Sequence, residues 1–306
     1  MNTDFYKKLK ELLPSAEIAY AEPMSRHTTF RIGGEADVFI KISKEEQLSI
    51  LIPQLVENGV PYYLIGKGSN LLVSDAGFRG VVIRLGDDFE DVNVNGCNIT
   101  AGAGASMAQI AKAAHGNSLT GFEFAAGIPG SIGGGVIMNA GAYDGELKDI
   151  VTRVRFMDQT GSAKEYTGEE MQFDYRTSAL KGKTEYIVLQ VEMELQPGNG
   201  ETILGKMQEL AKRRKEKQPL EYPSAGSTFK RPKGYFAGKL IGDAGLSGYT
   251  IGGARVSEKH NGFVINTGNA TARDVKKLIG EISQKVYDEF QVVLEPEVIL
   301  LGDFEE

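Results

Sequence analysis

The sequence has little of the residues that build metal and redox sites. Among its 306 residues there are one cysteine, three histidines and no tryptophan. A zinc or iron site of ordinary ligand spacing needs several such side chains, so no protein metal site is expected. The single thiol, Cys97, cannot form a disulfide within one chain, which favours a reducing compartment such as the cytoplasm.

Long apolar runs and an excess of basic charge are also lacking. No apolar stretch approaches the roughly 20 residues that a membrane span needs, and the polar segment Met1–Lys10 is unlike a secretory signal. The net charge is −7, which disfavours non-specific binding to nucleic acid or to anionic membranes. We therefore expect a cytoplasmic protein that has neither of these partners.

Glycine, in contrast, is abundant: it supplies 38 of the 306 residues, against a usual share of about 7%. Much of the excess lies in Gly66–Leu72 and Gly127–Gly135, and the second segment continues to Asn139–Tyr143. Without a Cβ, the backbone lets ligand atoms approach its N–H groups closely, and concave runs of N–H groups attract phosphate. Neither glycine segment holds Cys, His or an acidic cluster, so we expect a cofactor that supplies the chemistry itself. The alternative is that these glycines serve tight turns and close packing.

Several common glycine and serine motifs do not match. The segments Gly66–Leu71 and Gly102–Met107 begin like G-x-G-x-x-G but lack its third glycine, which argues against a Rossmann dinucleotide site. The run Lys67–Ser69 lacks the spacing of a nucleoside-triphosphatase loop. No serine lies in a G-x-S-x-G elbow, so esterase chemistry has no support.

Hydrophobic periodicity predicts an α+β protein. The expected helices are a first one carrying Phe5, Leu9, Leu12 and Leu13, then Glu45–Asn58, Met107–Ala114, a short one over Ile132–Met138, Glu201–Lys217 and Thr271–Phe290. The expected strands are Ala36–Ile42, Tyr62–Ile65, Val81–Arg84, Val92–Val94, Asn98–Ala101, Val151–Met157, Tyr186–Leu195, Gly253–Val256 and Phe263–Asn266. Asn95-Gly96 predicts a hairpin turn, and Pro197–Gly200 is a candidate linker between domains.

Six motifs occur along the chain in this order: Thr28–Gly34, Gly66–Leu72, Ala126–Gly133 with Asn139–Tyr143, Tyr175–Ser178, Ala225–Lys230 and Leu294–Val298. Together they resemble the motifs of the UDP-N-acetylenolpyruvoylglucosamine reductase family. The resemblance implies a two-lobed FAD-binding domain of the vanillyl-alcohol-oxidase type and a smaller α+β substrate domain. The FAD-binding domain is expected at 1–198, with a lobe boundary near 60–85 and a C-terminal strand, 296–306, that returns to it. The substrate domain is expected at 199–295.

The resemblance also implies the cofactors. FAD is expected to bind without a covalent bond, because the glycine segments hold no His or Cys, and NADPH is the expected co-substrate. The residues expected to hold FAD lie in the glycine segments and the motif that follows them. They are Gly66, Lys67, Gly68, Ser69, Asn70, Leu71, Gly127, Ile128, Pro129, Gly130, Ser131, Gly133, Gly134, Asn139, Gly141 and Ala142.

The implied reaction reduces the enolpyruvyl double bond of UDP-N-acetylglucosamine enolpyruvate to UDP-N-acetylmuramate, a step of peptidoglycan synthesis. By position in the motifs, Arg176 is expected to meet the substrate carboxylate and Ser227 to deliver a proton to C2. Glu297 is expected to stabilise the enolate or to relay the proton. The ordinary roles of such residues are a surface ion pair, a turn residue and a solvated carboxylate.

The chain between Tyr175-Arg176 and Gly226-Ser227 is short. The resemblance therefore points to the shorter subtype of the family, which lacks an extra tyrosine-bearing segment, and to a monomer. Expected neighbours of the UDP-sugar substrate are Tyr175, Lys217, Lys230, His260 and Asn261. Two alternatives are a flavin oxidase of the same fold acting on a small alcohol, and a non-catalytic sugar-nucleotide binding protein.

Overall fold

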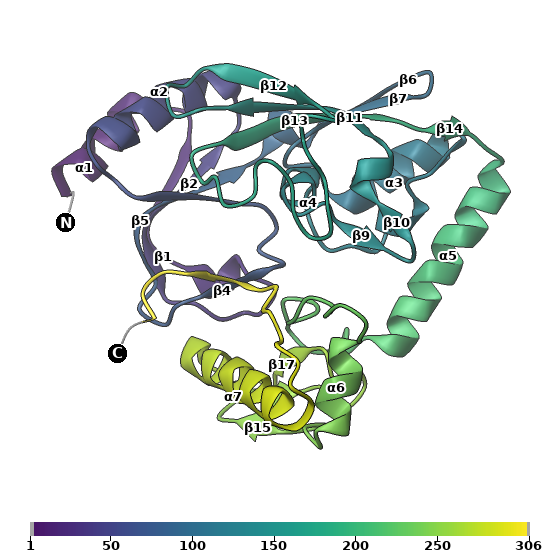
Figure 1. Cartoon of the computed structure of the whole chain (residues 1–306). Coiled ribbons are helices and arrows are strands. Elements are labelled where there is room, and N and C mark those ends of the chain that lie inside the picture. Colours follow the sequence, from purple (N-terminus) through teal and green to yellow (C-terminus); the bar gives the residue numbers. More distant parts are fainter. Residues whose placement is uncertain (1–2, 305–306) are drawn as a thin grey trace. The chain divides into compact units, whose positions relative to one another are not determined.

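The computed structural model describes residues 3–304, and these form two compact units (Figure 1). Unit 1 consists of Met1–Tyr20, Val38–Gly66 and Gly80–Arg213, whereas unit 2 consists of Ala21–Asp37, Lys67–Arg79 and Arg214–Glu306. Residues 1–2 and 305–306, which the predicted domain ranges include, lie outside the described residues. These two units are defined by contacts within the chain. The expected domains at 1–198 and 199–295 are defined by the ligand that each would bind, and they stay a prediction.

The helices agree closely with the hydrophobic periodicity. The α-helices are α1 (Thr3–Leu12), α2 (Glu45–Glu57), α3 (Met107–Gly116), α4 (Ile132–Ile137), α5 (Gly200–Lys217), α6 (Ala237–Asp243) and α7 (Ala272–Phe290). Short 3-10 turns are η1 (Met24–Arg26), η2 (Asp87–Glu90), η3 (Glu123–Ala125) and η4 (Leu147–Asp149). The hydroxyls of Ser106 and Thr271 accept hydrogen bonds from backbone N–H groups three residues on, which caps α3 and α7.

Unit 1 contains a five-stranded antiparallel sheet of order β12-β11-β13-β7-β6. Its strands are β6 (Val92–Asn95), β7 (Asn98–Gly102), β11 (Val151–Met157), β12 (Ala163–Thr167) and β13 (Ile187–Glu194). The predicted hairpin between β6 and β7 is confirmed, and Gly96 has the positive φ of 60° that such a turn requires. Short pairs in the same unit are β8 (Leu119–Thr120) with β14 (Gln196–Pro197), and β9 (Gly141–Ala142) with β10 (Gly145–Glu146).

A further sheet has the order β1-β2-β5-β3. Its strands are β1 (Glu17–Pro23), β2 (Glu35–Ile42), β3 (Tyr62–Ile65) and β5 (Phe78–Leu85). In unit 2, β15 (Thr250–Ile251), β16 (Ala254–Val256) and β17 (Val264–Asn266) form an antiparallel sheet on which α7 packs. Also in unit 2, β4 (Leu71–Val73) pairs in parallel with β18 (Ile299–Leu301), so the segment after the first glycine loop lies beside the end of the chain.

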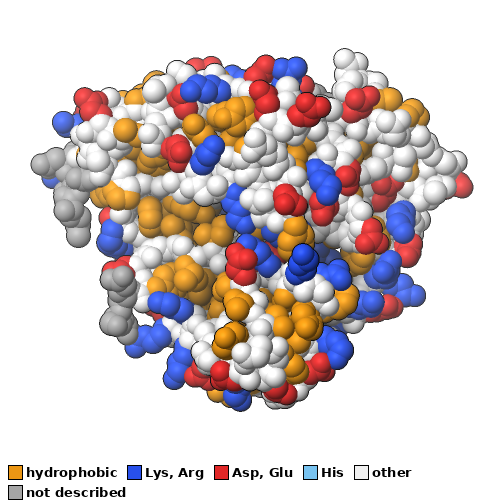
Figure 2. Space-filling model, in the orientation of Figure 1, with side chains coloured by type: hydrophobic (Ala, Val, Ile, Leu, Met, Phe, Trp, Pro, Cys, Tyr) orange, Lys and Arg blue, Asp and Glu red, His pale blue; other side chains and the backbone are white. Residues whose placement is uncertain are grey.

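The visible surface carries charges of both signs. Figure 2 shows Lys and Arg side chains interspersed with Asp and Glu side chains over one face. Among the described residues on that face, neither sign of charge forms an extended patch. None of the helices among residues 3–304 is both long and apolar enough to cross a bilayer.

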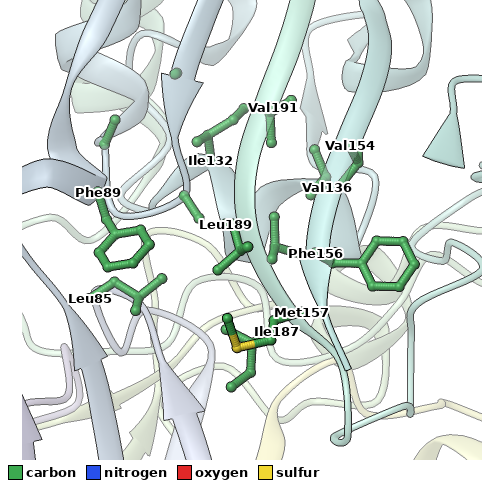
Figure 3. Close-up of a cluster of buried hydrophobic side chains, with 14 of the residues drawn as sticks. Leu85, Phe89, Ile132, Val136, Val154, Phe156, Met157, Ile187, Leu189 and Val191 are labelled. Carbon is green, nitrogen blue, oxygen red and sulfur yellow. The ribbon is translucent and has the colours of Figure 1, made fainter. Parts of the chain in front are cut away.

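Each unit has its own hydrophobic core. In unit 1, Ile132 and Val136 of α4 join Val154 of β11 and Val191 of β13 in one cluster, which Figure 3 shows. The apolar side of α4, the short helix that follows the second glycine segment, is therefore part of the core. The core of unit 2 draws on separate parts of the chain, since Phe30 and Leu72 pack with residues of α6 and α7.

Candidate active site

Gly66, the first residue of the first glycine segment, lies beside the second glycine segment in unit 1. A Cβ built on Gly66, at the end of β3, would lie 2.4 Å from Oγ of Ser131 in the second segment. Real Cβ atoms do not approach other atoms so closely, so only glycine fits at position 66 without a shift. Gly66 is exposed although it lies against Ser131. The two segments thus present bare backbone at one place.

The rest of the first glycine loop is fixed within unit 2 by its carbonyl groups. The carbonyl of Gly68 accepts a hydrogen bond of 3.1 Å from the N–H of Thr29, and that of Asn70 accepts one of 3.0 Å from Ile299. The N–H groups of Gly68 and Ser69 donate no hydrogen bond to any residue in the described part of the chain. Gly68 has a φ of +63°, a conformation that glycine adopts at little cost. The loop thus leaves two successive donors for an anion.

The glycines at the start of α4 have different surroundings. A Cβ on Gly133 would meet Ala103 at 2.8 Å, and one on Gly135 would meet the terminal methyl of Met107 at 2.2 Å. Gly134, between them, is exposed, and the nearest atom to its Cβ position is Oγ of Ser131 at 3.8 Å. Close packing therefore explains Gly133 and Gly135, whereas Gly134 presents open backbone.

The motif after α4 is a tight hairpin whose turn residues Tyr143 and Asp144 have φ values of 52° and 67°. The turn brings Glu146 opposite Gly141, where any side chain would collide with it at 2.7 Å. The buried Asn139 donates to the Glu146 carboxylate at 2.9 Å and accepts from the N–H of Lys148 at 2.9 Å. Asn139 therefore supports the hairpin from inside the protein.

Arg176 is placed beside this hairpin, and its guanidinium donates to the carbonyl of Gly141 at 3.3 Å. Its backbone is left-handed, with a φ of 55°, a strained conformation that costs about 1–3 kcal/mol and tends to occur at functional sites. The Lys148 ammonium, 2.8 Å away, the Asn139 amide and the charge of Arg176 together lower the pKa of Glu146. A cationic group is thus held at the edge of the second glycine segment.

Ser227 and Glu297 are brought together within unit 2. The N–H of Glu297 donates to the carbonyl of Thr228 at 2.8 Å, and the N–H of Lys230 donates to the carbonyl of Glu295 at 2.9 Å. The segments at 227–230 and 295–297 thus run side by side. The Ser227 side chain is exposed, with its hydroxyl 3.2 Å from the carbonyl of Phe229, and Glu297 is half-buried.

The expected substrate neighbours fall into two groups. Tyr175 is 43% exposed in unit 1, where the Arg176 guanidinium lies 5.1 Å from the centre of its ring. In unit 2, Lys230 forms an ion pair with Glu295, and Lys217 is exposed at the end of α5.

His260 and Asn261 directly precede Gly262, whose carbonyl accepts a 2.8 Å hydrogen bond from the N–H of Thr228. Nδ1 of His260 accepts a hydrogen bond from the N–H of Gly262 at 3.1 Å, and burial lowers the pKa of His260. The buried Oδ1 of Asn261 has no hydrogen-bond donor among the described residues.

Three supporting residues were not singled out from the sequence. Thr29 joins the first glycine loop to the chain before Ser227, because its hydroxyl donates to the carbonyl of Ser224 at 2.6 Å. Buried Thr228 is bonded to Val264 and to Glu297, and Glu146 faces the cation of Arg176. For Glu146, the two-residue turn that precedes it is a local sequence pattern that could have indicated its place. Thr29 and Thr228 have no such pattern, because their hydrogen-bond partners are distant in sequence.

Comparison with known proteins agrees with this geometry. Residues 36–167 match a family model described as an FAD binding domain. Residues 218–301 match one described as UDP-N-acetylenolpyruvoylglucosamine reductase, C-terminal domain. The fold and its bare glycine backbone thus belong to a flavin-dependent oxidoreductase, and the expected α+β fold with FAD as cofactor is confirmed.

Whole-chain relatives identify the family. The chain is 53% identical to a UDP-N-acetylenolpyruvoylglucosamine reductase of Caldanaerobacter subterraneus subsp. tengcongensis, over 97% of both chains. It is 50% identical to that of Clostridioides difficile, over 99% of both. A crystal structure of the reductase from Thermus caldophilus has a TM-score of 0.80 at 35% identity, covering 94% of this chain and 99% of that one. This chain belongs to the UDP-N-acetylenolpyruvoylglucosamine reductase family.

Proposed function

We propose that Arg176, Ser227 and Glu297 carry out the reduction that defines this family, in which NADPH supplies the electrons and the enolpyruvyl double bond of UDP-N-acetylglucosamine enolpyruvate is reduced. The product, UDP-N-acetylmuramate, is a precursor of peptidoglycan. FAD, which the two glycine segments would hold, would supply the hydride-transfer chemistry between NADPH and C3 of the enolpyruvyl group. The protein must then stabilise the negative charge that develops at C2 and supply a proton there.

Arg176 is proposed to hold the substrate carboxylate into which this negative charge spreads. A guanidinium stays charged at all relevant pH values and can bind a carboxylate through two parallel hydrogen bonds. The left-handed backbone of Arg176 and its contact with Gly141 hold its charge beside the second glycine segment. A fixed cation needs no reorganisation when charge develops on the substrate.

Ser227 is proposed as the proton donor to C2, with Glu297 stabilising the enolate or relaying the proton. The observation that carries this assignment is the 2.8 Å hydrogen bond from Glu297 to Thr228, because it places a carboxylate residue beside the neighbour of Ser227. A serine hydroxyl is a weak acid, so it requires a strongly basic acceptor or an assisting group. Glu297 is the carboxylate residue whose backbone is bonded to Thr228, directly after Ser227.

The residues expected to hold FAD fit a dinucleotide diphosphate. Gly66 provides backbone without a side chain beside Ser131, and Gly134 is exposed next to it. Gly68 and Ser69 offer N–H groups that the described protein does not use. Such donors suit phosphate oxygens. We propose that these residues, with the others predicted in both glycine segments and at Asn139, Gly141 and Ala142, bind FAD non-covalently.

The residues that contact the substrate and the functional domains are also proposals. Tyr175, Lys217, Lys230, His260 and Asn261 are proposed to line the UDP-sugar site, and the unsatisfied acceptor of Asn261 supports its part in this. The functional division is proposed as 1–198 for FAD and 199–295 for substrate, with 296–306 returning to the FAD domain.

We also propose a cytoplasmic monomer of the shorter subtype that binds no nucleic acid. The net charge of −7 and the single cysteine support the setting. Light scattering and cell fractionation would check these two points, with a dimer or a membrane-bound fraction contradicting them.

Stopped-flow absorbance tests the catalytic assignment by separating the two half-reactions. Arg176→Gln should leave reduction of FAD by NADPH nearly unchanged and slow reoxidation by the enolpyruvyl substrate by roughly 10²- to 10³-fold, the range for loss of one charge-stabilising group. Arg176→Lys keeps the charge but loses the paired geometry, so an intermediate rate is expected. Equal rates for all three proteins would contradict the proposal.

A further inference from the structure

Asn70, at the end of the first glycine loop, is bonded through both its side chain and its backbone to the segment that carries Glu297. Its side-chain Nδ2 donates to the carbonyl of Glu297 at 3.0 Å. Its own carbonyl accepts a hydrogen bond of 3.0 Å from the N–H of Ile299. Asn70 is therefore bonded to the chain on either side of Val298, where β18 runs in parallel beside β4.

Glu297 has both of its backbone polar groups fixed. Its N–H donates to Thr228 at 2.8 Å, and its carbonyl accepts from Asn70 at 3.0 Å. Val298, next in sequence, is buried, which limits movement of that side of the chain. The backbone from which the Glu297 carboxylate extends is therefore held by two anchors, Thr228 next to Ser227 and Asn70 in the glycine loop.

We infer that Asn70 is a positioning residue that sets where the Glu297 carboxylate lies, in addition to its place in the flavin-binding loop. The inference rests on the proposed role of Glu297 in proton transfer. Because Asn70 belongs to the loop and donates to the backbone of Glu297, the flavin-binding segment and the carboxylate segment are joined at this residue.

The bonding of the same loop to Thr29 supports this reading. The carbonyl of Gly68 accepts from the N–H of Thr29, whose hydroxyl donates to Ser224. The loop is thus connected to the chain three residues before Ser227 as well as to Glu297. The N–H groups of Gly68 and Ser69 donate to no residue in the described part of the chain, whereas the carbonyl groups and the Asn70 amide are bonded to the segments at Thr29 and Glu297.

The test compares Asn70→Ala and Asn70→Asp with Glu297→Gln and with the double variant Asn70→Ala/Glu297→Gln. Asp keeps the size of Asn but replaces the amide that donates to Glu297, so it gives a second variant if Ala lowers the yield of folded protein. The matched control is Asn269→Ala, an exposed asparagine of unit 2 outside the site. FAD content, FAD affinity and both half-reaction rates are measured for each holoenzyme.

Because Asn70 is also proposed to bind FAD, its variants are compared with the FAD site saturated, where the slowing of reoxidation should exceed any slowing of reduction by NADPH. Their reoxidation by the enolpyruvyl substrate should be about 10- to 100-fold slower, the usual effect of misplacing a reacting group by about 1 Å. In the Glu297→Gln background, Asn70→Ala should add less than about twofold, because the two residues act through the same carboxylate.

Two results overturn the inference while leaving the role of Glu297 intact. In the first, Glu297→Gln slows reoxidation, and Asn70→Ala slows it by the same factor in the Glu297→Gln background as in the parent protein. In the second, the Asn70 variants lose FAD affinity and, once saturated with FAD, reoxidise at the parental rate. If Glu297→Gln itself reoxidises at the parental rate, the proposed role of Glu297 fails, and the inference fails with it.

Discussion

The second glycine segment and the Ser227–Glu297 region hold their functional groups in different ways. Around Gly133 and Gly135 the protein is so closely packed that a single added methyl group would collide with Ala103 or Met107. Around Ser227 and Glu297 the position of the chain is set by hydrogen bonds between backbone groups, such as Glu297 to Thr228. Lack of space restricts the residue type in the second glycine segment, whereas many residue types could make the backbone hydrogen bonds of the Ser227–Glu297 region.

This difference explains which residues a single sequence reveals. A crowded backbone requires glycine, so the segment at 127–135 stands out by composition. A backbone hydrogen bond leaves no mark on residue type. Ser227 and Glu297 were therefore recognisable only through a motif shared with a family.

The largest expected effect concerns the proton donor. Ser227→Ala should leave reduction of FAD by NADPH nearly unchanged and slow reoxidation by about 10²- to 10⁴-fold, since a positioned acid contributes that much. Its backbone contacts do not depend on the side chain, so the thermal midpoint should be close to that of the parent. Stopped-flow absorbance and thermal unfolding measure the two quantities. If neither half-reaction slows, Ser227 is not the donor.

Gly68→Ala should be strongly destabilising, because its Cβ would lie 1.9 Å from the carbonyl oxygen of His27 and its φ is +63°. The left-handed backbone and the overpacking together predict a loss of roughly 2–5 kcal/mol. Gly182→Ala is the control: it has a φ of +78° with no atom within 4 Å, and about 1–2 kcal/mol is expected. Urea unfolding measures both, and equal losses would show that crowding at Gly68 is unimportant.

Gly133→Ala and Gly134→Ala separate packing from ligand binding within one helix. Gly133→Ala should cost about 1–3 kcal/mol of stability because Ala103 leaves no room. Gly134→Ala should be neutral or stabilise the protein by up to about 1 kcal/mol through helix propensity, yet weaken FAD binding. Thermal unfolding without FAD and a flavin titration distinguish the two; a Gly134 variant with parental FAD affinity would contradict the assignment.

The smallest expected effect is a dependence of stability on pH. Burial lowers the pKa of His260, and its Nδ1 accepts a hydrogen bond that protonation would break. The unfolded chain therefore takes up the proton first, so stability should fall as the pH drops below the unfolded value of about 6.5. His260→Asn keeps an acceptor and should flatten that part of the curve. Thermal midpoints between pH 5 and 8 measure it, and parallel curves for both proteins would rule out His260 as the cause.

Much of the fold was predictable because its helices and long strands have clear periodicity. The hairpin at Asn95-Gly96 and the capped helix α7 are examples. Strand β12 was missed because its residues are mostly exposed and polar, and β4 because it overlaps the end of the first glycine segment, which was expected to be a loop. Helix α6 was not among the expected helices, because its seven residues are too few to show a helical period.

The site was predictable only in part. Gly66 is exposed, and its role in holding FAD stays a prediction, whereas crowding shows that Gly68, Gly133 and Gly135 also serve packing. The hydrogen bonds of Thr29 to Ser224 and of Asn70 to Glu297 join residues 195 and 227 positions apart. Local patterns contain no information on such pairs, because the tertiary fold alone brings them together.

Segments of the two units alternate along the chain, and this affects how the protein folds during synthesis on the ribosome. The core of unit 2 needs Phe30 and Leu72 from the early chain and the helices that follow residue 214. Phe30 and Leu72 therefore cannot pack into the core of unit 2 until more than a hundred further residues of unit 1 have been synthesised. A nascent chain halted before α6 would contain the residues of the unit 1 core but would lack most residues of the unit 2 core.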